Sequence, residues 1–96
     1  MHLDFNVSVN NLPQMADFCV VGSGPAGMTV ALELEGAGRS VLLLEGGGLE
    51  RSEESQNIYK GEVIGDAYFK LDEARLRYLG GTSGHWGWVV LSIRLT

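Results

Sequence analysis

Two short apolar runs with a helical pattern between them dominate the hydrophobic pattern of the chain. Residues 18–21 (FCVV) and 41–44 (VLLL) are continuous apolar runs, which are typical of parallel strands buried on both faces. In the stretch between them, small and apolar residues recur at three- to four-residue spacing, which predicts a helix. The apolar face of this helix consists of Ala26, Gly27, Val30, Ala31 and Leu34.

Proline and glycine mark the two ends of the predicted helix. Pro25 fits the first turn, because its missing N–H would have no partner there. Gly36 and Gly38 supply the stop signal. The order of strand, glycine turn, helix and strand predicts a βαβ unit with a parallel sheet.

Three glycines between the first strand and the helix follow the pattern G-x-G-x-x-G. Gly22 permits a sharp turn, Gly24 lets the backbone approach a pyrophosphate, and Gly27 lets the helix pack closely on the strand. Glu45 stands 23 residues after Gly22, where a carboxylate can accept hydrogen bonds from an adenosine ribose. These features predict a dinucleotide at the amino end of the helix. The alternative is a purely structural turn, since a chain with 14 glycines can produce one such motif by chance.

Composition limits the classes of function. A net charge of −5 and a pI near 4.8 argue against nucleic acid or an anionic membrane surface as partner. No apolar run has a membrane-spanning length and no export signal is evident, so a cytoplasmic location is expected. The single cysteine, Cys19, is interpreted as a small core residue of the first strand.

Residues 1–16 are expected to form a leader or arm before the first strand. Within it, Phe5, Val7 and Val9 alternate with polar residues, which fits either a short edge strand or an arm that crosses the body. His2 is interpreted as a solvated residue without a role.

The pattern is weaker after Glu45. Residues 46–48 (GGG) let backbone approach the adenine or ribose of a nucleotide, and they equally fit a plain strand-to-helix loop. Residues 52–59 predict a helix with a solvated acidic face, and residues 61–65 a turn region with an extended stretch at 62–64. The next apolar residues are expected in a core or an interface, with a stacking site as the less favoured alternative: Tyr68, Phe69 and Leu71.

A second glycine-rich stretch covers residues 75–88 (RLRYLGGTSGHWGW). Its glycines, short hydroxyl side chains and tryptophans suit a loop that presses backbone amides and hydroxyls against a flat polar ligand. An ordinary glycine-rich loop anchored by aromatic residues would have the same composition.

The first glycine turn followed by LGGTSGHW, over residues 16–87, resembles the flavin-dependent oxidoreductases of the glucose-methanol-choline (GMC) family. It is most similar to the branch of sugar and polyol dehydrogenases and pyranose oxidases, whose second motif has the pattern GG-x-S/T-x-HW. The resemblance implies FAD, with the first turn on the pyrophosphate, Glu45 on the adenosine ribose and the second motif beside the flavin. The implied cofactor-binding residues are Gly22, Ser23, Gly24, Pro25, Ala26, Gly27, Glu45, Gly46, Gly80, Gly81, Thr82, Ser83 and His85.

The resemblance also implies a reaction, namely hydride transfer from the CH–OH group of an alcohol or sugar to FAD. In the family the base lies far along the chain, and nothing in this sequence matches it, so we assign no catalytic residue and predict no metal site. His85 matches the histidine that carries the covalent flavin in pyranose oxidases. Many relatives keep that histidine without the bond, so a packing or hydrogen-bonding role for His85 is preferred.

The predicted fold is α/β: a partial Rossmann-like FAD/NAD(P)-binding βαβ unit with glycine-rich loops and an incomplete parallel sheet over residues 17–88. Residues 89–96 are interpreted as an edge strand or as a truncation artefact, and the chain as an amino-terminal fragment of a flavoenzyme. An incomplete sheet leaves apolar surface exposed, which predicts self-association. The isolated chain is expected to bind FAD weakly or not at all and to be inactive as a fragment.

Two other interpretations stay open at this stage. An NAD-binding Rossmann oxidoreductase would suit Glu45, which disfavours a 2′-phosphate, although nothing in a minimal nicotinamide site requires LGGTSGHW. A non-catalytic truncated domain would suit the length of 96 residues and the unmatched tail.

Overall fold

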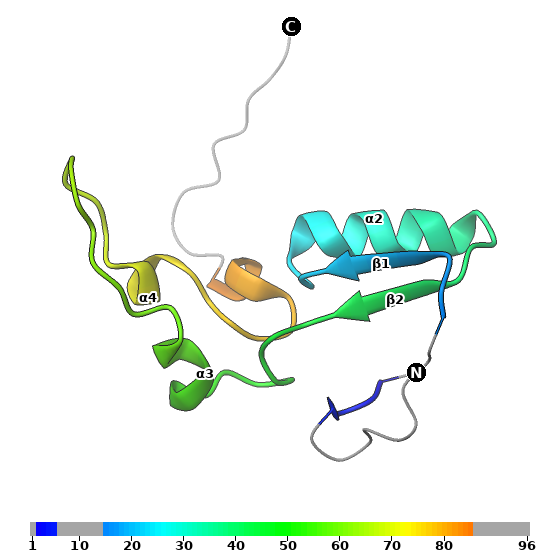
Figure 1. Cartoon of the computed structure of the whole chain (residues 1–96), viewed down its shortest axis with the longest axis horizontal. Helices are drawn as coiled ribbons and strands as arrows, with labels where there is room; N and C mark the ends of the chain where they lie inside the picture. Colours follow the sequence, from blue (N-terminus) through cyan, green and yellow to red (C-terminus); the bar gives the residue numbers. More distant parts are fainter. Residues whose placement is uncertain (1, 6–14, 86–96) are drawn as a thin grey trace, which may run out of the picture.

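The structure is a computed structural model, which describes residues 2–5 and 15–85. The predicted strand, helix and strand are confirmed, and short helices follow them (Figure 1). The elements are β1 (Phe18–Val21), α2 (Pro25–Gly36), β2 (Val41–Leu44), α3 (Glu53–Asn57), α4 (Leu71–Ala74) and η2, a 3-10 helix (Gly81–His85). The predictions for Val7, Val9 and residues 86–96 lie outside the described residues.

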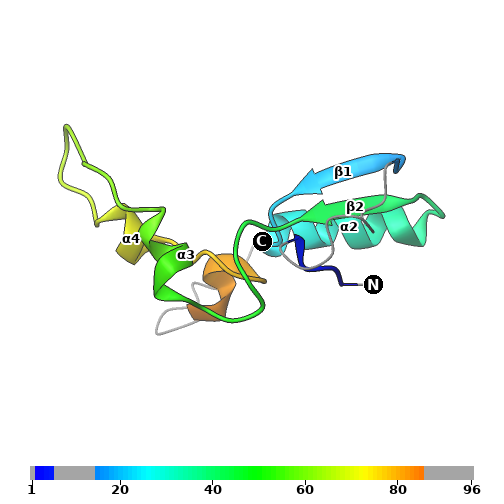
Figure 2. The same ribbon diagram turned by 60° about the horizontal axis from the view of Figure 1, so that its bottom comes forward.

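β1 and β2 pair in parallel, with Phe18 opposite Val41 and Val21 opposite Leu44. The helix α2 is the crossover that parallel pairing requires, and it covers one face of the two strands (Figures 1 and 2). The ladder extends past the strands, since the N–H of Gly22 donates to the carbonyl of Leu44 over 2.7 Å. The βαβ unit is thus formed by residues 17–45.

The first turn of α2 packs directly on the glycine turn. Gly22 has a φ of +99°, a left-handed conformation that side chains disfavour. A Cβ at Gly27 would overlap the carbonyl oxygen of Gly22 and lie 3.5 Å from Cγ1 of Val20. The close packing of helix on strand predicted for Gly27 is therefore present.

The sheet is incomplete, as predicted, and its second face has no cover among the described residues. Val21 is 81% exposed and Phe18 44% exposed, so the expectation of strands buried on both faces is wrong for this chain. The interpretation of Cys19 as a core residue is also wrong, because Cys19 is exposed. Val20 faces α2, and alternation along β1 places Cys19 on the opposite, open face. Self-association through this face stays a prediction.

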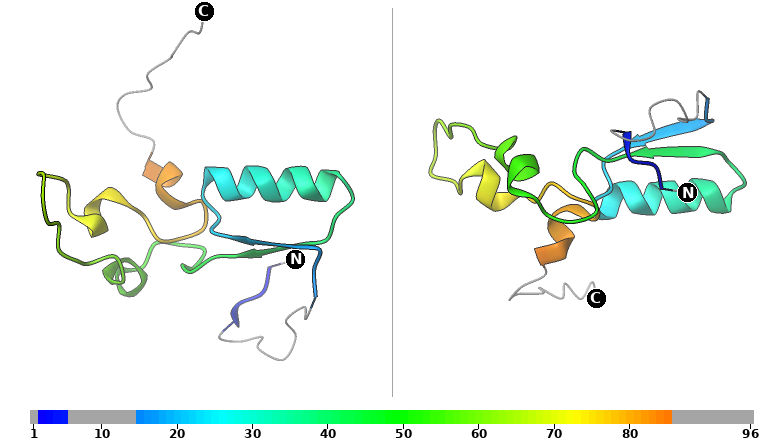
Figure 3. Two further views of the ribbon diagram at one scale, coloured as in Figure 1. Left: turned by 45° about the horizontal axis from the view of Figure 1, so that its top comes forward. Right: turned by 90° about the horizontal axis from the view of Figure 1, so that it is seen from below.

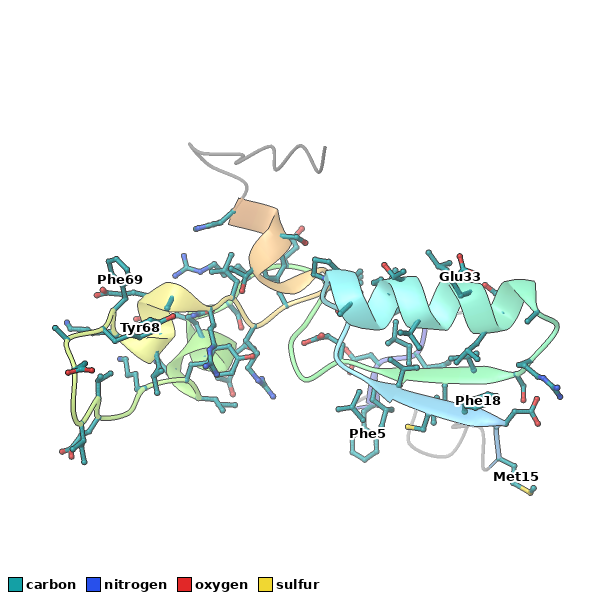
Figure 4. All side chains as sticks on the ribbon, turned by 90° about the horizontal axis from the view of Figure 1, so that it is seen from above. Phe5, Met15, Phe18, Glu33, Tyr68 and Phe69 are labelled. Carbon is teal, nitrogen blue, oxygen red and sulfur yellow. The ribbon has the colours of Figure 1, made fainter. Side chains whose placement is uncertain are left out.

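A second lobe, formed by α3, α4 and the loop between them, lies beyond the carboxyl ends of the strands (Figures 1 and 3). The helix predicted at 52–59 is confirmed as the shorter α3, whose N-cap Ser52 accepts a hydrogen bond from the N–H of Ser55. Residues 62–64, which are expected to be extended, form no strand and lie in the loop. Tyr68 and Phe69 contact each other edge to face at the outer end of this lobe (Figure 4), and they are 66% and 74% exposed. They are not core residues, and an interface role stays a prediction.

After α4 the chain returns to the βαβ unit. The N–H of Leu79 donates to the carbonyl of Gly48 over 2.9 Å, and η2 then starts beside the amino end of α2 (Figure 3). The described part of the predicted loop 75–88 thus contains a 3-10 helix. The returning chain thus places the second glycine motif beside the first.

We expect Gly27→Ala to destabilise the chain by about 2 kcal/mol or more, because a Cβ at residue 27 has no space against the Gly22 carbonyl. Gly36→Ala is the matched control, since a Cβ there meets nothing within 4 Å and alanine favours the helix. Urea unfolding followed by circular dichroism measures both free energies. Equal stability of the two variants would contradict the packing described for Gly27.

Candidate functional site

A pocket of about 400 Å³ lies where the carboxyl ends of β1 and β2 meet the returning chain. Ligands of open α/β sheets bind at this end of the strands, and the volume is within the range of small-molecule sites. The pocket is lined by Val21, Gly22, Gly24, Pro25, Glu45, Gly46, Tyr59, Arg75, Leu76, Arg77, Gly81 and Thr82.

The amino end of α2 borders this pocket, which Gly24 and Pro25 line. Gly24 is the N-cap, and no side chain caps the helix. A Cβ at Gly24 would meet nothing within 4 Å, so the backbone there is open to a ligand. Free first-turn amides and the helix dipole favour an anionic group, and the absence of a side chain at Gly24 lets it come close.

Glu45 lies at the end of β2, half-buried, and three hydrogen bonds orient its carboxylate. Its Oε2 accepts from the N–H of Ser23 over 2.9 Å and from the Ser23 hydroxyl over 2.7 Å. Its Oε1 accepts from the N–H of Gly47 over 2.8 Å. Burial raises the pKa of Glu45, but the Ser23 hydroxyl and nearby backbone N–H groups outweigh burial and hold that pKa below its ordinary value. The carboxylate therefore stays ionised and able to accept a ribose hydroxyl.

Ser23 lies between the two glycine motifs rather than in the pocket lining. Its side chain is completely buried, and its hydroxyl accepts a hydrogen bond from the N–H of Gly80 over 3.0 Å. Gly80 and Gly81 have φ values of +91° and +60°, and a Cβ at Gly81 would lie 3.4 Å from the Cα of Gly24. The structure thus brings the second motif into contact with the first.

The short hydroxyl side chains of the second motif are used within their own segment. The Thr82 hydroxyl accepts from the N–H of Leu76 over 3.2 Å, and the Ser83 hydroxyl donates to the carbonyl of Gly80 over 2.6 Å. His85 is exposed, at the end of η2 outside the pocket lining. The packing or hydrogen-bonding role preferred for His85 stays a prediction, with covalent flavin attachment as its alternative.

Two arginines, Arg75 and Arg77, line the pocket. The Arg77 guanidinium lies over Gly46, where a Cβ would come within 2.5 Å of Nη2, and its Nη1 donates to the Ser55 hydroxyl over 2.9 Å. Arg75 has no hydrogen bond or ion pair through its guanidinium within the part of the chain that the structure describes. The pocket lining therefore contains two positive side chains and one carboxylate, in a chain whose net charge is −5.

Gln56 of α3 fixes the segment that carries these arginines. Its buried amide donates to the carbonyls of Asp72 and Arg75, and its Oε1 accepts from the N–H of Arg77 over 3.2 Å. The Ser55 hydroxyl also donates to the Arg77 carbonyl over 2.9 Å. The predicted helix with a solvated acidic face thus has a second, inward face that holds the pocket wall.

Seven of the thirteen residues expected to bind the cofactor line the pocket: Gly22, Gly24, Pro25, Glu45, Gly46, Gly81 and Thr82. The other six lie outside its lining: Ser23, Ala26, Gly27, Gly80, Ser83 and His85. Sequence reasoning missed five lining residues: Val21, Tyr59, Arg75, Leu76 and Arg77. The arginines carried a usable signal, since two basic residues stand within four positions before LGG in an acidic chain.

Comparison with known proteins identifies the ligand class of the first motif. Residues 17–56 match the family model of an FAD binding domain. Over 48 residues, half of this chain, the sequence is 44% identical to 6-methylpretetramide 4-monooxygenase of Streptomyces rimosus. Over 86 aligned residues, which cover 72% of this chain, it is 35% identical to a monooxygenase of Claviceps purpurea (strain 20.1). No solved structure matches the chain significantly.

The matched segment contains β1, the glycine turn, α2, β2 and Glu45, which are the parts that form the floor of the pocket. The cofactor of this site is therefore FAD, which the open backbone at Gly24 fits. The chain spans 10% and 16% of the length of these two relatives. Within the described residues, no helix has both the length and the apolar character needed to cross a membrane.

We expect acid to destabilise the chain through Glu45. Because the folded-state pKa of Glu45 is lowered, its contribution is present above the ordinary glutamate pKa and is lost as the pH falls through the lowered value. Glu45→Gln should flatten this part of the curve of unfolding free energy against pH. Glu33→Gln, at an exposed site on the outer face of α2 (Figure 4), is the control that should keep the wild-type slope. Parallel curves for wild type and Glu45→Gln would contradict the assignment.

Proposed function

We propose that this chain is the FAD-binding part of a flavin-dependent oxidoreductase. The observation that carries the proposal is the pocket at the strand ends, which is lined by the open amino end of α2, the ionised Glu45 and two arginines. The amino end of α2 and Glu45 belong to the segment that matches an FAD binding domain, and the arginines follow that segment in the sequence. Both relatives bear the names of oxygen-using enzymes, which supports the same class of cofactor.

Each wall of the pocket suits one part of FAD. The amino end of α2 and Arg75 offer donors and positive charge to the diphosphate. Glu45 accepts from a hydroxyl of the adenosine ribose, as an acid at the end of the second strand does in this type of fold. FAD, when bound, supplies the hydride acceptance, and these residues bind and orient it.

We further propose oxidation of a CH–OH group of an alcohol or sugar as the reaction of the whole protein. The order of the two glycine motifs and the LGGTSGHW stretch support this reaction, through the resemblance to the GMC family. Monooxygenation is the second candidate, and the printed names of both relatives favour it. Anaerobic reduction of the bound flavin by an alcohol or sugar, without a nicotinamide, would support the first candidate. If the flavin is reduced by NAD(P)H but not by an alcohol or sugar, the second candidate is supported. The cytoplasmic location stays a prediction.

Equilibrium dialysis of the purified chain against FAD tests cofactor binding directly. We expect saturable binding of one FAD per chain, competition by ADP, and weaker competition by NADP than by NAD, because Glu45 repels a 2′-phosphate. The binding should be weak for the isolated chain. A binding free energy of about −4 kcal/mol would give half-occupancy at about 1 mM FAD. If binding does not approach saturation at this concentration, the proposal is contradicted.

We expect Arg75→Gln to raise the FAD dissociation constant roughly three- to tenfold, the loss of one charge-assisted contact in a partly solvated site. The loss should shrink as salt is added, because the contact is electrostatic. Arg39→Gln, at the exposed turn before β2 and outside the pocket lining, is the matched control. An equal rise of the FAD dissociation constant in Arg75→Gln and Arg39→Gln would mean that FAD binding depends on the net charge of the chain and not on the position of Arg75.

A further inference from the structure

The Ser23 hydroxyl joins three parts of the chain at one buried point. It lies in the turn after β1, donates to Oε2 of Glu45 at the end of β2, and accepts from the N–H of Gly80 at the start of the second motif. The Gly80 contact connects residues 57 positions apart in the sequence. Within residues 2–5 and 15–85, Ser23 is the side chain that solvent does not reach at all.

The direction of these hydrogen bonds is fixed by chemistry. An ionised carboxylate can only accept, so the Ser23 hydroxyl must give its one proton to Glu45. Its lone pairs are then free for the N–H of Gly80. A side chain without a hydroxyl would leave the part-buried N–H of Gly80 without this acceptor. Loss of an acceptor from a partly buried donor costs more than the hydrogen bond contributes when it is present.

Little apolar burial is available to hold the two motifs together by other means. Ala31 and Leu76 are the buried apolar side chains of the described residues. The glycines of the second motif also allow it many conformations, since Gly80 and Gly81 already have positive φ values. The position of residues 80–83 therefore depends on specific polar contacts, of which that to Ser23 is buried most deeply.

We propose that Ser23 is a positioning residue, whose hydroxyl fixes the second glycine motif over the dinucleotide turn and so forms one wall of the FAD pocket without touching FAD. The identity of the ligand rests on the proposed function, whereas the junction between Ser23 and Gly80 does not. Ser23→Ala should free residues 80–83 from the turn and weaken binding of FAD through loss of this wall.

Amide hydrogen exchange measured by NMR on the whole chain without ligand tests the junction. In Ser23→Ala, exchange of the Gly80 N–H should become about tenfold faster or more, as expected for loss of a buried hydrogen bond. The N–H of Met28, bonded to the Gly24 carbonyl in α2, should keep its rate and so report that the βαβ unit is folded. The control is Thr29→Ala, which removes an exposed hydroxyl bonded to the Pro25 carbonyl and should leave Gly80 unchanged.

An unprotected Gly80 N–H in the wild-type chain, or the same Gly80 rate in Ser23→Ala and wild type, would overturn the proposal. If Ser23→Ala also exposes Met28, Glu45→Gln serves as the second variant. It keeps the Ser23 hydroxyl as acceptor, so Gly80 should stay protected, and loss of protection would overturn the assignment of Ser23.

Dialysis against FAD separates this inference from the proposed function. The FAD dissociation constant should rise in Ser23→Ala and not in Thr29→Ala. A Ser23-dependent Gly80 rate in a chain that binds no FAD would leave the junction standing and overturn the proposed function. Equal FAD affinity in wild type and Ser23→Ala would overturn the positioning role, while the proposed function stood.

Discussion

The hydrogen bonds between Ser23 and Glu45 are the contact on which the rest of the site depends. They tie the end of β2 to the turn after β1, and they do so with a charged acceptor in a partly buried position, where such bonds are strong. The same serine accepts from Gly80, so the second motif is attached to this pair as well. Removal of the carboxylate charge would weaken the bonds between Ser23 and Glu45, which links the protonation of Glu45 to the contact between the end of β2 and the turn after β1.

Polar contacts, rather than a large apolar core, hold the returning segment in place. Gln56 pairs with three backbone groups of residues 72–77, and Leu79 bonds to Gly48. Each bond is directional, so the arrangement is specific, yet the net contribution of each is modest because water offers competing partners. A dinucleotide that contacts both glycine motifs would add its binding free energy to this arrangement and stabilise it.

The glycines of the site are required for different reasons. Gly24 leaves open space beside the pocket, whereas Gly46 and Gly47 make room for Arg77 and for the backbone of residues 77–78. Gly84 lies against the Tyr78 hydroxyl. A glycine-rich stretch near a cofactor therefore serves the folding of its own loops as much as contact with the ligand. The arginine that Gly46 accommodates adds positive charge to a pocket in an acidic chain.

The amino-acid sequence predicts the βαβ unit, the glycine turn and Glu45 at the strand end, because apolar periodicity, glycine spacing and proline position are local properties of the chain. FAD was implied by the resemblance of the two glycine motifs to those of known flavoenzymes. Which side chains meet across 16 to 57 positions is visible only in the tertiary structure. Ser23 was expected to bind the cofactor, yet it is buried between Glu45 and Gly80. Gln56 belongs to a helix whose acidic face was expected to be solvated, and its side chain bonds to the segment that lines the pocket. Arg75 and Arg77 had no assigned role, and the structure places both in the pocket lining. Cys19 was expected in a core, and it is exposed because the described residues provide no layer over that face. Contacts between residues far apart in the sequence depend on the path of the loops that connect them. Local patterns of residue spacing do not specify that path.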